Sequence, residues 1–177
     1  MSMASWSLRR LRSLSDSELD GLAAVLVDCV QGGASVSFMN PLTHARALDF
    51  WRRVALSLGA GERALWIAED AHGVCGTVQV VWAPQENQPH RADLSKMLVH
   101  RRARRSGVGA ALLSAAETSA LEQGKTLLVL DTASADAERL YERGGWTRVG
   151  AIPGYALLPD GGLCATVLYF RGIAQPE

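Results

Sequence analysis

Residues 101–110 read Arg-Arg-Ala-Arg-Arg-Ser-Gly-Val-Gly-Ala, and no other stretch predicts as much about the fold. Glycine lets the backbone turn tightly and approach a ligand closely. The first amides of a helix that follows have no partner inside the helix, and they carry the positive end of its dipole. Four arginines precede the turn, so the stretch is typical of a site that binds an anion such as a diphosphate.

The neighbouring sequence places this stretch between a strand and a helix. Residues 91–99 have the apolar content that is typical of a strand, and a helical pattern begins at Val108. Two better-known phosphate loops do not fit. The dinucleotide fingerprint Gly-x-Gly-x-x-Gly would need glycine where Leu112 stands, and the Gly-Lys-Ser/Thr ending of a Walker A loop is absent from this stretch.

Two motifs resemble the GCN5-related N-acetyltransferase (GNAT) family. Residues 104–109 match the pattern Arg/Gln-x-x-Gly-x-Gly/Ala, which resembles the loop that binds the diphosphate of acetyl-CoA in that family. After a strand-like run at 126–132, residues 137–146 resemble the family's helix with the pattern Ala-x-x-Leu-Tyr-x-x-x-Gly-Phe/Trp. The resemblance covers the chain from about Leu65 to Phe170, and it implies an acetyltransferase that uses acetyl-CoA.

Three further segments are similar to the tabtoxin-resistance branch of this family. They are Gly32–Met39, Pro153–Tyr155 and the turn at Pro159–Gly161. This resemblance implies a small amino-acid-like amine as acceptor, such as a toxin or an antibiotic, and hence a role in toxin resistance.

Length and composition narrow the class of protein. A chain of 177 residues is long enough for one domain with a substantial core, and we expect a single acetyltransferase domain over residues 1–177. Eighteen basic and eighteen acidic residues give no overall attraction to nucleic acid or to an anionic membrane. Three cysteines without metal-ligand spacing suit free thiols in a reducing compartment. The absence of a long apolar segment favours a cytoplasmic protein. The absence of metal-ligand spacing favours a protein without a metal.

Hydrophobic periodicity and turn residues predict the order β-α-α-β-β-β-α-β-α-β-β. A strand is expected at 6–12, and a capping box at Ser15–Glu18 opens a helix that ends at Gly32-Gly33. Asn40-Pro41 is expected to begin the second helix, and a proline- and glycine-rich loop is expected to join final strands at 146–152 and 164–170. This order predicts an α/β (α+β) fold with helices on both faces of a mixed sheet. By resemblance, the sheet is largely antiparallel, with two parallel strands that splay at its centre.

The predicted cofactor-binding residues lie on the strand and on the glycine loop. The loop residues follow from the anion argument, because backbone amides and arginines would hold the diphosphate, in part through long-range attraction. By family resemblance, the strand backbone would pair with the pantetheine arm and with the acetyl carbonyl. The complete set is Met97, Leu98, Val99, Arg104, Arg105, Ser106, Gly107, Val108, Gly109 and Ala110.

Three side chains are candidates for proton transfer. With a strand period of two, Asp93 shares a face with Met97 and Val99, and the family often carries a carboxylate base at this upstream position. Asp131 ends the next strand and is expected to face the same cleft, unless it caps the following turn; Asp93 has the alternative of a strand-end ion pair with an arginine. Tyr141 occupies the family's tyrosine position and is expected to protonate the departing thiolate, with packing against Trp146 as its alternative.

The acceptor is expected to bind beside the segment that follows the first helix. In the family this segment borders the acceptor site, and the expected contacts are Gly33, Ala34, Ser35 and Phe38. We therefore predict acetyl transfer to the primary amine of a small molecule, by direct attack in a ternary complex, in a chain that can form a homodimer. The alternatives are acetylation of protein N-termini or lysines, and a catalytically idle sensor that binds CoA.

Overall fold

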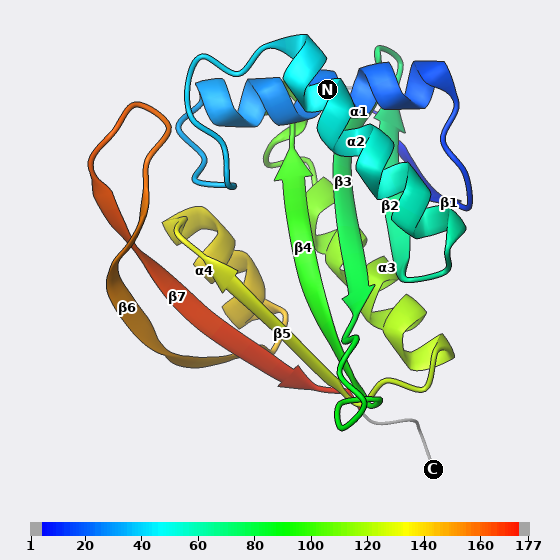
Figure 1. Cartoon of the computed structure of the whole chain (residues 1–177), viewed down its shortest axis with the longest axis vertical. Helices are drawn as coiled ribbons and strands as arrows, with labels where there is room; N and C mark the ends of the chain where they lie inside the picture. Colours follow the sequence, from blue (N-terminus) through cyan, green and yellow to red (C-terminus); the bar gives the residue numbers. More distant parts are fainter. Residues whose placement is uncertain (1–4, 174–177) are drawn as a thin grey trace.

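The computed structural model describes residues 5–173, which form one seven-stranded sheet with helices on both faces (Figure 1). The predicted order of elements is confirmed, with one short 3₁₀ turn added. The elements are β1 (Ser7–Leu11), α1 (Asp16–Gln31), α2 (His44–Gly59), β2 (Arg63–Asp70), β3 (Gly73–Trp82), β4 (Arg91–Val99), η1 (Arg101–Ala103), α3 (Val108–Glu122), β5 (Leu127–Thr132), α4 (Ala135–Arg143), β6 (Thr147–Leu157) and β7 (Leu163–Gly172).

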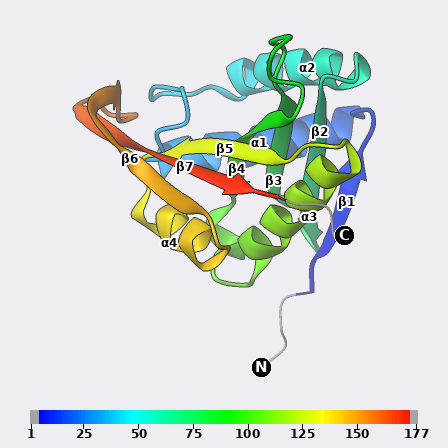
Figure 2. The same cartoon turned by 90° about the horizontal axis from the view of Figure 1, so that it is seen from below.

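The strands lie in the order β1-β2-β3-β4-β5-β7-β6, and β4 with β5 is the one parallel pair in residues 5–173. Helices α1 and α2 cover one face of the sheet and α3 and α4 cover the other (Figure 2). Each face buries its own apolar cluster. Trp51 and Leu98 belong to the cluster under α1 and α2, while Leu94 and Leu112 belong to the cluster under α3 and α4.

The central splay is the feature of the fold that matters most for function. β4 and β5 pair only over Arg91–Asp93 and Leu127–Val129. Beyond that point β4 continues with β3 and β5 continues with β7, so the two strands diverge, as Figure 1 shows. The edge of β4 that faces β5 is therefore free of a strand partner from Leu94 onward.

The local signals in the sequence act as predicted at α1 but not at α2. The capping box at the start of α1 is confirmed, because Ser15 Oγ accepts from the Glu18 amide and Glu18 accepts from the Ser15 amide at 2.7 Å. The predicted start of the second helix at Asn40-Pro41 is wrong. The Thr43 hydroxyl accepts from the Arg46 amide at 3.2 Å, so α2 begins only at His44.

The predicted loop at Pro153-Gly154 is also wrong, since β6 runs through both residues to Leu157. β6 is the outer strand of the sheet, where a proline removes no obligatory ladder bond. Its pairing with β7 is interrupted between Ile152 and Ala156 and then resumes, so the two residues lie within an irregular part of the edge strand. The turn itself lies at residues 158–162.

Candidate functional site

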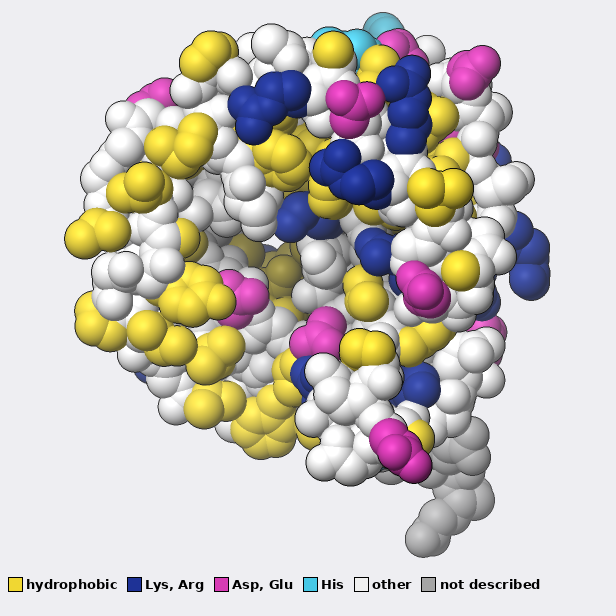
Figure 3. Space-filling view, viewed as in Figure 1, with side chains coloured by type: hydrophobic (Ala, Val, Ile, Leu, Met, Phe, Trp, Pro, Cys, Tyr) yellow, Lys and Arg dark blue, Asp and Glu magenta, His cyan; other side chains and the backbone are white. Residues whose placement is uncertain are grey.

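A cavity of about 1040 Å³ occupies the splay between β4 and β5. Its walls come from the segment after α1, from the second half of β4 with the loop before α3, from the end of β5 with α4, and from the β6–β7 hairpin. The space-filling view shows this hollow between the hairpin and the rest of the molecule, with basic and acidic side chains on its walls (Figure 3). The volume is sufficient for two small-molecule substrates side by side.

The loop before α3 opens onto the cavity with a free helix N-terminus. Gly107 is the N-cap in a left-handed conformation with φ of 87°, and no side chain caps the helix. Arg104, Arg105, Gly109 and Ala110 line the cavity beside it. Amides at an uncapped helix start are left for a ligand to satisfy, so the loop suits an anion.

Two of the four arginines of this stretch form ion pairs, and the other two form none within the described residues. Arg101 bonds the Asp28 carboxylate, and Arg102 bonds Asp70 at 2.9 Å, which lowers the pKa of that carboxyl. Arg104 donates to the Val99 carbonyl at 3.2 Å, and neither it nor Arg105 forms an ion pair within residues 5–173. Two guanidinium groups therefore remain for a diphosphate.

Two of the predicted loop residues do not line the cavity. The Val108 side chain is buried in the core under α3. Ser106 braces the loop, because its hydroxyl donates to the Ala103 carbonyl at 2.6 Å and its carbonyl accepts from the Trp6 indole at 3.1 Å. Both residues shape the turn, and only their backbone remains available to a ligand.

The predicted strand residues Met97, Leu98 and Val99 line the cavity along the free edge of β4. The Leu98 side chain is buried in the cluster under α1 and α2, so its contribution to the cavity comes from its backbone. An extended ligand with amide groups can pair with such an edge as a further strand would.

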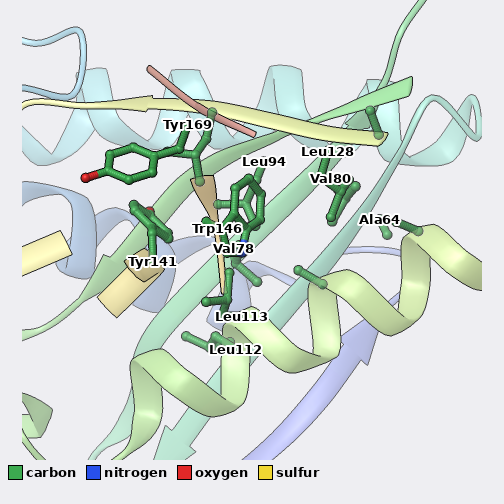
Figure 4. Packing of buried hydrophobic residues seen from close by; sticks show 14 of the residues in the cluster. Ala64, Val78, Val80, Leu94, Leu112, Leu113, Leu128, Tyr141, Trp146 and Tyr169 are labelled. Carbon is green, nitrogen blue, oxygen red and sulfur yellow. The ribbon is translucent and has the colours of Figure 1, made fainter. Parts of the chain in front are cut away.

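Tyr141 lies on α4, 4% exposed, and borders the cavity. Its ring packs against Trp146 and Tyr169, with centroids 5.7 and 6.0 Å away (Figure 4). Its hydroxyl has no hydrogen-bond partner in the described part of the chain. Burial and, to a smaller extent, the charge of Asp131 raise the pKa of the Tyr141 phenol well above its ordinary value. The phenol is therefore protonated at neutral pH and can donate a hydrogen bond.

Asp131, at the end of β5, faces the same cavity. The Thr166 hydroxyl of β7 donates to its Oδ2 at 2.7 Å, which fixes the carboxylate while leaving Oδ1 free. Its negative charge acts on both Tyr141 and Lys96. The structure thus brings Asp131 to the same cavity as Tyr141, whereas the sequence analysis paired Asp131 with Asp93.

The expectation that Asp93 faces this cleft is wrong. A bulge in β4 shifts the register between Gln79–Ser95 and Thr77–Leu98, so the alternation of faces breaks at this point. Met97 and Val99 consequently pack on the α3 side of the sheet. Asp93 lies outside the cavity lining, and its carboxylate accepts from Arg91 at 2.9 Å, which is the alternative of a strand-end ion pair.

The segment predicted to contact the acceptor forms the opposite wall. Gly33, Ala34, Ser35 and Phe38 all line the cavity. Ser35 Oγ donates to the Leu157 carbonyl of β6 at 3.2 Å, which joins this segment to the hairpin. Two segments far apart in the sequence are thus joined at the acceptor end of the cavity.

Sequence reasoning missed Lys96, which also lines the cavity. No motif marked it, because its orientation depends on the bulge in β4. The one available signal is its chemistry: the chain has two lysines among its eighteen basic residues, and this one stands in an apolar strand.

No helix within residues 5–173 has the length and apolar character that a membrane crossing requires.

Comparison with known proteins agrees with the geometry of the site. Residues 61–148 match the family model described as an acetyltransferase (GNAT) domain.

Solved structures with the same fold include three acetyltransferases. One is a GNAT superfamily phosphinothricin acetyltransferase from Sinorhizobium meliloti in complex with acetyl-CoA. It is similar at 19% identity with a TM-score of 0.80, and the match covers 95% of this chain and 88% of the acetyltransferase chain. A ribosomal-protein-alanine N-acetyltransferase from Brucella melitensis is 19% identical, with 94% and 99% covered and a TM-score of 0.77. An N-acetyltransferase from Staphylococcus aureus Mu50 is 15% identical, with 95% and 98% covered and a TM-score of 0.79.

At these identities the structural neighbours establish the fold alone, because one fold hosts many functions. Within residues 5–173, the helix N-terminus without a side-chain cap, the two arginines without an ion pair and the edge of β4 without a strand partner fit acetyl-CoA. The match of residues 61–148 to an acetyltransferase (GNAT) domain identifies the protein as an acetyl-CoA-dependent N-acetyltransferase.

Proposed function

We propose that the protein acetylates the primary amine of a small molecule, by direct attack within a ternary complex. The observation that carries this proposal is the single cavity, which joins the anion-binding loop of α3 to Asp131, Tyr141 and the segment after α1. Acetyl-CoA, when bound, supplies an acetyl group activated as a thioester. Residues of this chain would bind and orient both substrates and transfer the protons.

Binding is assigned to the loop and to the free strand edge. The amides of residues 107–110, with Arg104 and Arg105, would hold the diphosphate. The backbone of Met97–Val99 would pair with the pantetheine arm along the edge that β5 leaves open. Gly33, Ala34, Ser35 and Phe38 would enclose the acceptor and exclude water from it.

Proton transfer is assigned to Asp131 and Tyr141. Asp131 Oδ1 would accept a proton from the acceptor ammonium, directly or through water, while Thr166 holds Oδ2. Tyr141 would donate its phenolic proton to the sulfur as the carbon–sulfur bond breaks, and the proton that the acceptor nitrogen loses as the amide forms would restore the phenol. Protonation of Asp131 removes one of the two causes that raise the pKa of Tyr141, so the first transfer makes Tyr141 a better acid for the second.

Cys29, one of the cysteines that line the cavity, favours direct attack over a covalent route. Burial raises the pKa of the Cys29 thiol, so little of it is thiolate at neutral pH. Cys164 is partly exposed and stands 3.6 Å from Ser35 Oγ. We expect initial-rate plots against acetyl-CoA at several acceptor concentrations to intersect. Parallel lines, together with a loss of turnover in Cys164→Ala, would contradict direct attack.

The segment after α1 and the β6–β7 hairpin flank the acceptor end on two sides, which favours a small molecule over a protein chain. The test is release of free thiol from acetyl-CoA with two panels, one of amino acids and small toxin-like amines and one of peptides with free N-termini or lysines. We expect turnover with the first panel. Turnover with peptides alone would favour protein acetylation, and tight CoA binding with no turnover on either panel would favour a sensor.

The exposed face of the β6–β7 hairpin supports a homodimer. Leu163 is 73% exposed, Val149 is 63% exposed and Tyr155 is 57% exposed, and hydrophobic side chains gather over this hairpin in Figure 3. Val149 and Tyr155 belong to β6, an edge strand of the sheet, and exposed apolar side chains on an edge strand are typical of an interface. We expect twice the monomer mass by light scattering, and Leu163→Glu should return the protein to monomer mass.

A further inference from the structure

Lys96 is a cation of the cavity that the steps above do not use. It lies on β4 among the residues that line the acceptor end, with Ser37 and Phe38 opposite. The chain has one other lysine, Lys125, which is remote from the cavity and donates to the Pro89 carbonyl at 2.7 Å. The two lysines therefore form a natural comparison within one molecule.

The backbone at Lys96 is strained in a way that exposes its side chain to the cavity. Its φ is 49°, in the left-handed region that a lysine rarely adopts. It sits at the bulge where the register of β3 and β4 shifts. Bulges re-aim side chains beside functional sites, and strain of this kind persists where a site depends on it.

The ammonium of Lys96 is poorly satisfied. Its Nζ is 3.5 Å from Ser37 Oγ and 5.7 Å from the centroid of the Phe50 ring. No carboxylate lies within 4.0 Å of it in residues 5–173, although the charge of Asp131 is close enough to oppose the effect of burial, which lowers the pKa of Lys96. An ammonium has three donors, so this group lacks an anionic partner.

We propose that Lys96 binds a carboxylate of the acceptor, which makes the preferred acceptor a small zwitterion with its amine and carboxylate close together. This inference rests on the proposed function. Asp131 and Lys96 present opposite charges on separate strands of one cavity, so a zwitterion can place its ammonium at Asp131 and its carboxylate at Lys96. An amine without the carboxylate leaves Lys96 unpaired, which disfavours its binding.

The test compares matched acceptors on matched variants. Each amino acid is assayed beside its own carboxamide, which keeps the amine and side chain and removes the charge. Wild type and Lys125→Met should favour the amino acid by about 10- to 100-fold in kcat/KM, as expected for a hydrogen-bonded charge pair. Lys96→Met should lose that preference through a higher KM for the amino acid, with the amide changed less than about threefold.

Three outcomes would overturn the inference. An unchanged preference in Lys96→Met would show that another group reads the carboxylate. An equal loss for the amino acid and the amide would show a general structural or catalytic role. Weaker CoA binding by Lys96→Met in calorimetry, with the preference retained, would assign the lysine to the cofactor.

A second readout does not depend on turnover. Acetic anhydride labels both lysines, and mass spectrometry measures each one, with Lys125 as the internal reference. In the presence of CoA, amino acids should slow the labelling of Lys96 and the matching amides should not. If no amine is acetylated but this protection appears, the proposed function fails and the inference stands; if turnover occurs without protection, the inference fails alone.

Discussion

Gly107→Ala separates the anion-binding role of the loop from its effect on folding. Gly107 has φ of 87°, and a Cβ there would meet only Trp6, at 3.8 Å. Space is therefore available, and the cost is the left-handed conformation, about 1–2 kcal/mol for an L-residue. If the loop relaxes to avoid that cost, CoA binding must restore it, which corresponds to about 5- to 30-fold weaker affinity. Valine, which is β-branched, should cost well over tenfold.

Gly124→Ala is the matched control for this experiment. Gly124 has φ of 69° with nothing within 4 Å of a new Cβ, and it lies beyond the far end of α3, outside the cavity. Urea unfolding of the CoA-free proteins should show the cost as a loss of stability in Gly124→Ala, whereas calorimetry should show it as a weaker CoA affinity in Gly107→Ala. Wild-type CoA affinity in Gly107→Ala without a loss of stability, or wild-type affinity in Gly107→Val, would refute the assignment of this loop to the diphosphate.

Three further predictions concern the charged and phenolic groups of the cavity. Tyr141→Phe keeps the ring and deletes the proton, so it should bind acetyl-CoA as wild type does and lose turnover about 10²-fold; normal turnover across pH would leave Tyr141 a packing residue. Asp131→Asn should lower turnover about 10²-fold, less at a pH that deprotonates the free amine, whereas Asp93→Asn should have little effect; the opposite pattern would return the base to Asp93. Lys96→Met should raise the Tm at pH 7, because a lysine with a lowered folded pKa destabilises the native state in its charged form. That gain should shrink as pH rises toward 10, and a gain independent of pH would point to packing instead.

The elements and the anion-binding loop could be predicted because their signals are local. The capping box of α1, the glycine turn of α3 and the helix of Tyr141 each depend on residues within one or two turns. The start of α2 was misplaced because two capping signals compete within four residues, and Thr43 supplies the hydrogen bond.

The composition of the catalytic cavity could be predicted only in part. A bulge has no reliable sequence signal, so the period-two argument carried Asp93 to the wrong face and left Lys96 unnoticed. The position of Asp131 at the cavity could be predicted, because Asp131 lies at the end of β5 beside the splay and the bulge in β4 does not change the face of β5.

A crystal structure of the chain with CoA and an amino-acid acceptor would test the central claim most directly. We predict diphosphate oxygens about 2.7–3.2 Å from the amides of residues 107–110, the sulfur beside Tyr141, and the acceptor amine at Asp131. A diphosphate bound away from the start of α3, or an acceptor outside the cavity that joins these residues, would contradict the account.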